Sequence, residues 1–260
     1  MTELEVVGGG KMGEALLGGL LAAGWAEPAD LAVVELDEAR RAELAARFDG
    51  VTVTAEPISA PGAVLAVKPQ QVAAVAAQLG ALGVGRLLSI AAGVRLTTIE
   101  AVVPGGTAVV RAMPNTPSLV GRGAAAIAAG SASGDADLAW AEAILAAVGT
   151  VVRVDEVQLD AVTGLSGSGP AYVFLVAEAL IDAGVQAGLA RPLAADLVVQ
   201  TLLGSAELLA AGTPPAELRA AVTSPGGTTA AGLRALESAA VRAAFADAVA
   251  AATARSRELG

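Results

Sequence analysis

The segment Gly8-Gly9-Gly10-Lys11-Met12-Gly13 constrains the fold of this chain more than any other feature. It fits the pattern G-x-G-x-x-G, with a strand-like run, Leu-Glu-Val-Val, directly before it. The run EALLGGLLAAG follows with helical spacing and closes at Gly24, a typical residue just past a helix end. In this context the glycines permit a tight turn, close approach of a pyrophosphate, and close packing of helix on strand. The segment therefore predicts an α/β fold that binds a dinucleotide.

The residues after the second expected strand bear on which dinucleotide is bound. Strand 31–35 ends in Glu35, 22 positions after Gly13 (35 − 13). A carboxylate there can accept a hydrogen bond from a ribose 2′-hydroxyl, which favours NAD(H). Arg40 and Arg41 follow and could instead hold the 2′-phosphate of NADP(H), or could lie on the solvated face of a helix over 38–47. The sequence leaves the choice between NAD(H) and NADP(H) open.

Strands and helices alternate through the first 155 residues. We expect strands at 4–8, 31–35, 51–53, 63–67, 86–90, 107–111, 123–129 and 150–154. We expect further helices at 70–80, 97–103 and 135–148, the last N-capped by Asp135 or Gly134. Such alternation, rich in Val and Ala, predicts a mostly parallel sheet covered on both faces, with ligands at the carboxyl ends of its strands. Three segments are expected at that edge, beside the glycine turn: Val67-Lys68-Pro69, Ala91-Ala92-Gly93 and Met113–Pro117, which contains Asn115.

Beyond about residue 155 the strand pattern ends and helical periodicity continues to the C-terminus. The expected helices span 157–187 (interrupted at Ser166–Pro170), 192–211, 213–222, 228–238 and 241–258. We therefore predict a Rossmann-like NAD(P)-binding domain at 1–155 and an all-α domain at 156–260. The second half is apolar and poor in aromatic residues, so we expect it to complete its core against a second copy. A monomeric mass in dilute solution would count against that expectation.

Composition excludes several classes of function. The net charge of −10 and the pI near 4.5 argue against nucleic acid and anionic membrane surfaces as partners. Uninterrupted apolar runs stay below the ~18 residues of a membrane span, and Met1-Thr2-Glu3 leads straight into a strand-like segment, so we expect a soluble cytoplasmic protein. The chain has no Cys and no His, which excludes disulfides, thiol nucleophiles, Ser-His-Asp triads and histidine-bound metals; no metal is expected.

The stretch Thr223–Thr229, Thr-Ser-Pro-Gly-Gly-Thr-Thr, predicts a site for a small anion. Pro225 and the Gly226-Gly227 pair oppose regular structure, and Thr228 begins an apolar-periodic run typical of a helix. A bare loop entering a helix directs free N–H groups, hydroxyls and the positive end of the helix dipole at one spot. A carboxylate would suit that spot; the simpler alternative is an N-cap after a turn.

Motifs along nearly the whole chain resemble one enzyme family. They are Gly8–Gly13, Val67-Lys68-Pro69, Ser89–Gly93, Arg111–Pro117, Asp160–Tyr172 and Ser224–Thr229, in this order and at this spacing. Together they closely resemble pyrroline-5-carboxylate reductase, the last enzyme of proline biosynthesis. The resemblance implies NAD(P)H-dependent reduction of 1-pyrroline-5-carboxylate to L-proline, a Rossmann domain followed by a helical dimerisation domain, and dimers assembled into larger rings.

The resemblance also implies roles for particular residues. The substrate carboxylate is expected in the loop at Ser224, Gly226, Gly227, Thr228 and Thr229, and the helical half of a partner subunit is expected to complete the site. The cofactor is expected at Gly8, Gly9, Gly10, Lys11, Met12, Gly13, Glu35, Val67, Lys68, Pro69, Ala91, Ala92, Gly93 and Asn115. Lys11 departs from the polar uncharged residue that relatives often carry, and could add a cation near the pyrophosphate or point to solvent.

The chemistry of the reaction agrees with this residue inventory. A cyclic imine is activated at its own nitrogen, so its reduction needs positioning more than a strong protein acid. Thr229 is the expected hydrogen-bonding partner of the ring nitrogen, and Ser224 acts with it at the catalytic centre. A β-hydroxyacid dehydrogenase is disfavoured, because such enzymes use a lysine of the second domain and no lysine follows Lys68. A catalytically silent dinucleotide sensor is disfavoured by the intact second site.

Overall fold

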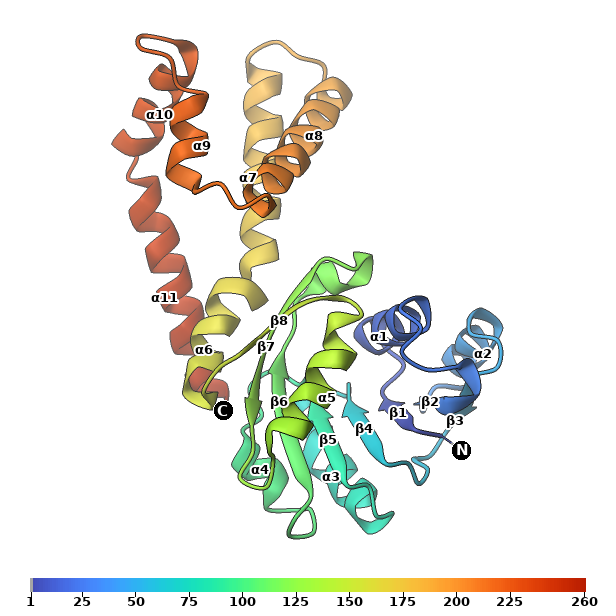
Figure 1. The fold of residues 1–260 in the computed structure, drawn as a ribbon. Coiled ribbons are helices and arrows are strands. Elements are labelled where there is room, and N and C mark those ends of the chain that lie inside the picture. Colours follow the sequence, from blue (N-terminus) through green and yellow to red (C-terminus); the bar gives the residue numbers. More distant parts are fainter. Residues whose placement is uncertain (1) are drawn as a thin grey trace. The chain divides into compact units, whose positions relative to one another are not determined.

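The computed structural model describes residues 2–260, which pack as two compact units (Figure 1). Unit 1 comprises the described residues through Ser168 together with Ala250–Gly260. Unit 2 comprises Gly169–Val249. The predicted domain boundary after residue 155 stays a prediction.

Unit 1 is built on an eight-stranded sheet with the order β3-β2-β1-β4-β5-β6-β7-β8. The strands are β1 Leu4–Val7, β2 Leu31–Val34, β3 Thr52–Thr54, β4 Gly62–Leu65, β5 Arg86–Ser89, β6 Ala108–Met113, β7 Gly123–Ala129 and β8 Gly149–Arg153. Every predicted strand is present. Strands β1–β6 are parallel, β7 is antiparallel to β6, and β8 is parallel to β7. The carboxyl ends of β7 and β8 therefore lie at the opposite edge from those of β1–β6.

The helices of unit 1 begin and end where local chemistry dictates. They are α1 Lys11–Ala22, α2 Glu38–Arg47, α3 Val72–Ala81, α4 Leu96–Glu100, α5 Asp135–Ala146 and α6 Leu159–Val162. Helix α1 ends before Gly24, whose φ of +63° suits glycine. Helix α2 is capped by Asp37, whose carboxylate accepts from the N–H of Arg40 at 2.8 Å. Of the two caps expected for α5, the structure has Gly134.

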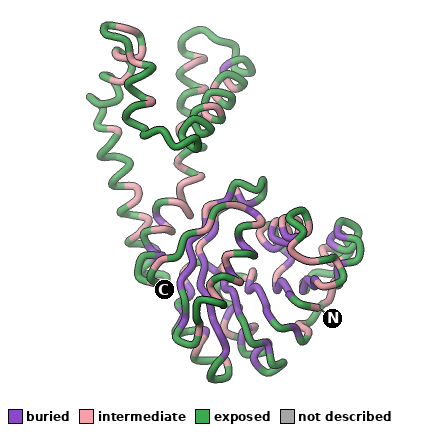
Figure 2. Tube along the Cα trace, in the orientation of Figure 1, coloured by how far each residue is buried: buried purple, intermediate pink, exposed green. Residues whose placement is uncertain are grey.

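Apolar side chains cover both faces of the sheet, as predicted. On one face Leu16 and Leu20 of α1 pack with Val6 of β1. On the other face Val72 and Leu79 of α3 pack with neighbouring strand residues. Figure 2 shows the buried residues concentrated along the strands. A fully buried Leu contributes about 1.5–3 kcal/mol, so these two layers hold the edge of the sheet where the cofactor is expected.

Unit 2 consists of helices with almost no buried residues (Figure 2). They are α7 Gly169–Gln186, α8 Arg191–Ala210, α9 Pro215–Ala221, α10 Thr228–Ser238 and the part of α11 Val241–Leu259 that ends at Val249. A π-helical turn, Thr163–Gly167, precedes α7 in place of the predicted break, and Pro170 sits in the first turn of α7, where proline is tolerated. Among the described residues of unit 2, Ala194 alone is buried. Unit 2 therefore has no core of its own.

Two helical stretches bear on the expectation that the chain spans no membrane. Glu156–Gln186 and Arg191–Ala210 are long and apolar enough to cross a membrane by length and composition alone. Neither contains an uninterrupted apolar run of that length, which is why run length missed them. One or two such helices are weak evidence, because helices that pack against other protein pass the same test.

Candidate active site

The glycine turn after β1 has the geometry of a phosphate cradle. Gly8 has φ +112°, and a Cβ there would lie 2.5 Å from the carbonyl oxygen of Ala66. A Cβ on Gly13 would lie 2.0 Å from the carbonyl oxygen of Gly8, whereas a Cβ on Gly10 would meet no atom within 4 Å. Backbone packing thus requires the first and last glycines, and the middle one leaves open access. Helix α1 starts at Lys11 without a side-chain cap, so its first N–H groups can face an anion.

A cavity of about 610 Å³ lies beside this turn, at the carboxyl ends of β1, β2 and β4. Its size is typical of small-molecule and cofactor sites. Five predicted cofactor residues line it: Gly8, Gly10, Glu35, Val67 and Lys68. Further lining residues that the motifs did not indicate include Leu36, Ala55, Pro57, Gln70 and Gln71. All of these follow a strand or lie just before α3. Their expected place at the carboxyl edge of the sheet could therefore have indicated them as cofactor-site residues.

Glu35 and Arg40 form hydrogen bonds with the backbone N–H and carbonyl groups of Gly9. The carboxylate of Glu35 accepts from the N–H of Gly9 at 3.1 Å and from the N–H of Asp37 at 3.0 Å. Arg40 Nε donates to the carbonyl oxygen of Gly9 at 2.9 Å. Arg41 Nη1 donates to the carbonyl oxygen of Glu35 at 3.0 Å. The end of β2 is thereby fixed against the glycine turn.

The other predicted cofactor residues of unit 1 do not line this cavity. Lys11 is exposed and borders a separate cavity of about 420 Å³, while Met12 is half-buried. Pro69 begins a short 3₁₀ turn, Pro69–Gln71. Their direct contact with a cofactor stays a prediction.

Two predicted cofactor segments farther along the edge make contacts within unit 1. Ala91 is buried and Ala92 exposed, and a Cβ on Gly93 would lie 3.3 Å from Leu259 Cβ. Asn115 uses both ends of its amide: Nδ2 donates to the carbonyl oxygen of Ser166 at 3.0 Å, and Oδ1 accepts from the N–H of Ala124 at 2.8 Å. Asn115 therefore braces the loop after β6, and its contact with the cofactor stays a prediction.

The predicted substrate loop lies in unit 2 and has the expected local form. Helix α10 begins at Thr228, and its N-cap, Gly227, provides no side-chain cap. Gly226 has φ +71°, and the N–H of Gly227 closes a turn onto the carbonyl oxygen of Ser224 at 3.1 Å. Ser224 and Thr228 are exposed and Thr229 is half-buried. Free N–H groups and accessible hydroxyls thus gather at one helix start, which suits a carboxylate.

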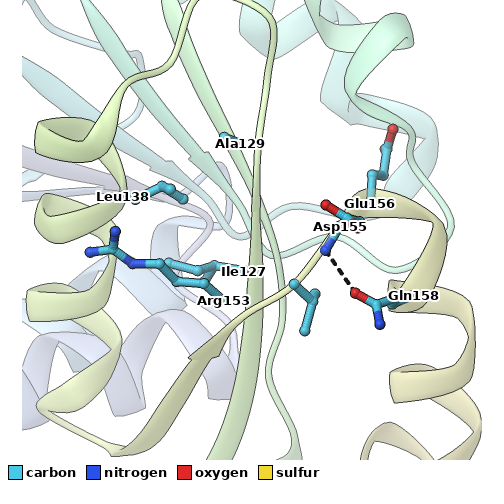
Figure 3. A pocket seen from close by; sticks show the side chains of 8 residues that line it. Ile127, Ala129, Leu138, Arg153, Asp155, Glu156 and Gln158 are labelled. Carbon is cyan, nitrogen blue, oxygen red and sulfur yellow. Dashed lines mark hydrogen bonds between the residues drawn. The ribbon is translucent and has the colours of Figure 1, made fainter.

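A further cavity of about 450 Å³ lies at the opposite edge of the sheet, beyond β7 and β8 (Figure 3). Its polar side chains already have partners. Arg153 pairs with Glu142 at 2.6 Å. Gln158 accepts from the N–H of Asp155 at 2.9 Å (Figure 3). Glu156 accepts from Arg111 at 2.9 Å. These groups stabilise the edge, and the cavity is no candidate for the active site.

Comparison with known proteins decides the family. A pyrroline-5-carboxylate reductase from Synechocystis is 47% identical over 265 aligned residues, covering 99% of this chain and 98% of the relative. The chain belongs to the pyrroline-5-carboxylate reductase family. A family model described as pyrroline-5-carboxylate reductase dimerisation matches residues 156–259, and one described as NADP oxidoreductase, coenzyme F420-dependent, matches residues 3–93. The resemblance inferred from the motifs and the predicted fold class are both confirmed.

Solved structures agree across the full length. A pyrroline-5-carboxylate reductase from Coxiella burnetii is 36% identical, with a TM-score of 0.93 over 100% of this chain and 98% of that one. A pyrroline carboxylate reductase from Plasmodium falciparum with NADP bound is 31% identical, with a TM-score of 0.85 over 100% of this chain and 98% of that one.

Membership of this family confirms the predicted enzyme class. Pyrroline-5-carboxylate reductases are oxidoreductases of proline biosynthesis that use NAD(P)H, and the family has a dimerisation domain. Within residues 2–260, no cluster of three or more Asp or Glu side chains could hold a metal ion.

Proposed function

We propose that this chain reduces 1-pyrroline-5-carboxylate to L-proline with NAD(P)H, the last step of proline biosynthesis, in the cytoplasm. The observation that carries the proposal is the intact loop Ser224–Thr229 at the uncapped start of α10, in a chain that matches reductases of this name over its whole length. The glycine turn of unit 1 and the cavity beside it supply a place for the cofactor.

When bound, the nicotinamide cofactor supplies the hydride that this reduction needs. The residues of the cradle fit such a group, because the open face at Gly10 and the uncapped start of α1 can receive a pyrophosphate. Glu35, Val67 and Lys68 line the cavity in which the rest of the cofactor would lie.

The residues of the substrate loop hold the imine in place. Ser224 Oγ and the N–H groups of Gly226 and Thr228 bind the carboxylate of the substrate. Gly227 was expected to donate as well, but its N–H is already donated to the carbonyl oxygen of Ser224, so Gly227 shapes the turn instead. Thr229 Oγ hydrogen-bonds the ring nitrogen, the atom whose charge changes during reduction. Because that nitrogen is protonated or nearly so, the protein orients the ring and excludes water and needs no strong acid. The absence of His, and of Lys after Lys68, suits this role.

The self-association of unit 2 belongs to the same proposal. We expect a homodimer formed through the helical half, with dimers assembled into a larger ring and with helices of the partner completing each site. The family model for dimerisation over residues 156–259 supports the dimer, as does the scarcity of buried residues in unit 2.

Thr229→Val tests the proposed chemistry. Losing a hydroxyl aimed at a changing charge raises the barrier by about 2–4 kcal/mol, so kcat/KM for pyrroline-5-carboxylate is expected to fall at least tenfold. Cofactor affinity, measured by calorimetry, should stay nearly unchanged. Thr213→Val is the matched control, because Thr213 is an exposed loop residue of the same unit. Turnover of Thr229→Val at the level of this control would remove Thr229 from the mechanism.

Steady-state oxidation of NADH or NADPH, followed by absorbance, tests the reaction itself. Consumption of either cofactor should require pyrroline-5-carboxylate and yield proline. A chain that binds the dinucleotide but never turns over would be a sensor, and the proposed function would fail.

A further inference from the structure

We propose that this chain selects NADH over NADPH and that Glu35 makes the selection. The inference deepens the proposed function and rests on it, since it concerns the adenosine end of the same cofactor site. The sequence left this choice open between Glu35 and the two arginines of α2. The hydrogen bonds of these three side chains decide it.

The carboxylate of Glu35 is held at the end of β2 and cannot easily turn away. Oε2 accepts from the N–H of Gly9 at 3.1 Å and Oε1 accepts from the N–H of Asp37 at 3.0 Å. An ionised carboxylate has about four acceptor sites, so each oxygen keeps one for a ligand. Glu35 also lines the 610 Å³ cavity. It is therefore placed to accept from ribose hydroxyls and to repel a phosphate dianion.

Arg40, the nearest alternative partner for a 2′-phosphate, already interacts with other groups through all three of its guanidinium nitrogens. Its Nε donates to the carbonyl oxygen of Gly9 at 2.9 Å, and its Nη1 donates to Glu43 at 2.9 Å. Its Nη2 forms an ion pair with Glu14, which also pairs with Arg47 at 2.5 Å. Moving Arg40 to a phosphate would break each of these interactions and release two carboxylates.

Arg41, the second arginine of α2, is anchored to the backbone through one of its nitrogens. Arg41 Nη1 donates to the carbonyl oxygens of Glu35 and Leu36, at 3.0 and 2.7 Å. At the start of α2, the N–H of Arg40 is taken by Asp37 Oδ1 at 2.8 Å. Of the described residues that line the cavity, Lys68 alone is cationic, and it follows β4, which β1 separates from β2. A 2′-phosphate would meet a fixed carboxylate, while Arg40 would have to leave its partners to reach it and Arg41 is anchored to two backbone carbonyls.

The NADP-bound relative from Plasmodium falciparum shows that this family's fold can accept the larger cofactor. The selection in this chain is therefore assigned to its own side chains rather than to the fold.

Dissociation constants measured by calorimetry test the inference without relying on turnover. The chain is expected to bind NADH at least tenfold more tightly than NADPH. Adenosine 5′-monophosphate and adenosine 2′,5′-bisphosphate, which contain only the adenosine end, should reproduce the preference. Glu35→Gln removes the charge and keeps the shape, so it should narrow the NADH/NADPH ratio at least fivefold, mainly by tightening NADPH. Glu38→Gln, which neutralises an exposed acid in the first turn of α2, is the matched control and should leave the ratio within twofold. Arg41→Ala tests the alternative partner for a 2′-phosphate.

Three results would overturn the inference. NADPH binding as tightly as NADH in the unaltered chain is one, and it needs no variant. An unchanged ratio in Glu35→Gln is another. A selective loss of NADPH binding in Arg41→Ala would assign the 2′-phosphate to Arg41. If the chain preferred NADH but did not reduce pyrroline-5-carboxylate, only the proposed function would be wrong. If it bound neither dinucleotide, both the proposed function and this inference would be wrong.

Discussion

Glu5 makes the stability of this protein depend on pH in an unusual direction. It lies in β1 with no solvent exposure, next to Ala32 and Ala63 in the neighbouring strands. Its Oε2 accepts from the N–H of Ile58 at 3.1 Å, while its Oε1 has no partner among the described residues. Burial raises the pKa of Glu5 from 4.5 to about 7, against the opposing effect of the Ile58 hydrogen bond.

The sign of the effect follows from this raised pKa. Below pH 4.5 the carboxyl group is protonated in the folded and the unfolded chain, and its stabilising contribution is complete. Between pH 4.5 and about 7 the unfolded chain ionises while the folded chain keeps its proton, so stability falls. Above about pH 7 both forms are ionised and the loss is constant. At about 1.4 kcal/mol per pKa unit, the full loss is about 3 kcal/mol.

Glu5→Gln removes the titration and keeps an acceptor for Ile58. Relative to the unaltered chain, the variant should gain about 3 kcal/mol in unfolding free energy between pH 4.5 and pH 8.5. Urea denaturation followed by circular dichroism measures this difference, with equal protein concentrations because association adds to apparent stability. Glu3→Gln is the control, since Glu3 is exposed near the start of the same strand. A difference that varies by less than 0.5 kcal/mol (about a third of a pKa unit) across this range would refute the reasoning.

Two more substitutions, each paired with a control substitution, probe the packing of unit 1. Gly13→Ala places a Cβ 2.0 Å from the carbonyl oxygen of Gly8, so the dinucleotide affinity measured by calorimetry should fall at least tenfold. A Cβ on Gly10 meets no atom within 4 Å, so the melting temperature of Gly10→Ala should lie closer to that of the unaltered chain than the melting temperature of Gly13→Ala does. Arg111→Met leaves the carboxylate of Glu156 without its buried partner and should cost about 2–4 kcal/mol in urea denaturation. Arg153→Met removes an exposed ion pair and should cost less than about 1 kcal/mol; equal costs would contradict the argument from burial.

The fold was largely predictable because hydrophobic periodicity and glycine positions determine where its elements form. The direction of β7 was the exception. Alternation of strands and helices favours a parallel sheet, but the connection between β6 and β7 contains only the 3₁₀ turn Thr116–Val120. A parallel connection needs a crossover of a dozen or more residues, so this short link joins antiparallel neighbours. The short gap between the expected strands 107–111 and 123–129 was the sequence feature that indicated this antiparallel pairing.

The candidate site was predictable in its residue types but not in its pairings. Motif spacing indicated Glu35 and Arg40 together without showing which of them faces the ligand. That choice depends on Arg40 reaching Gly9, 31 positions away, and on Glu14 holding it there. Such contacts depend on tertiary packing, which local sequence patterns do not encode. Glu5, an acid inside the central strand pattern Leu-Glu-Val-Val, was visible in the sequence, yet its burial follows only from its place between β2 and β4.

The apolar helices of unit 2 pose a choice between a lipid bilayer and another protein surface. Exposed apolar surface on this scale marks an interaction site in either case. A bilayer would have to accommodate acidic side chains such as Glu178 and Asp182 of α7 and Asp196 of α8 within its apolar core, which is costly. A second copy needs to cover only the apolar stripes and can leave the acids, and the Asp182–Arg191 ion pair at 2.6 Å, in water. The match of residues 156–259 to a dimerisation model agrees with this physical argument. Self-association therefore explains why the helices of unit 2, which have no core of their own, expose so many large apolar side chains.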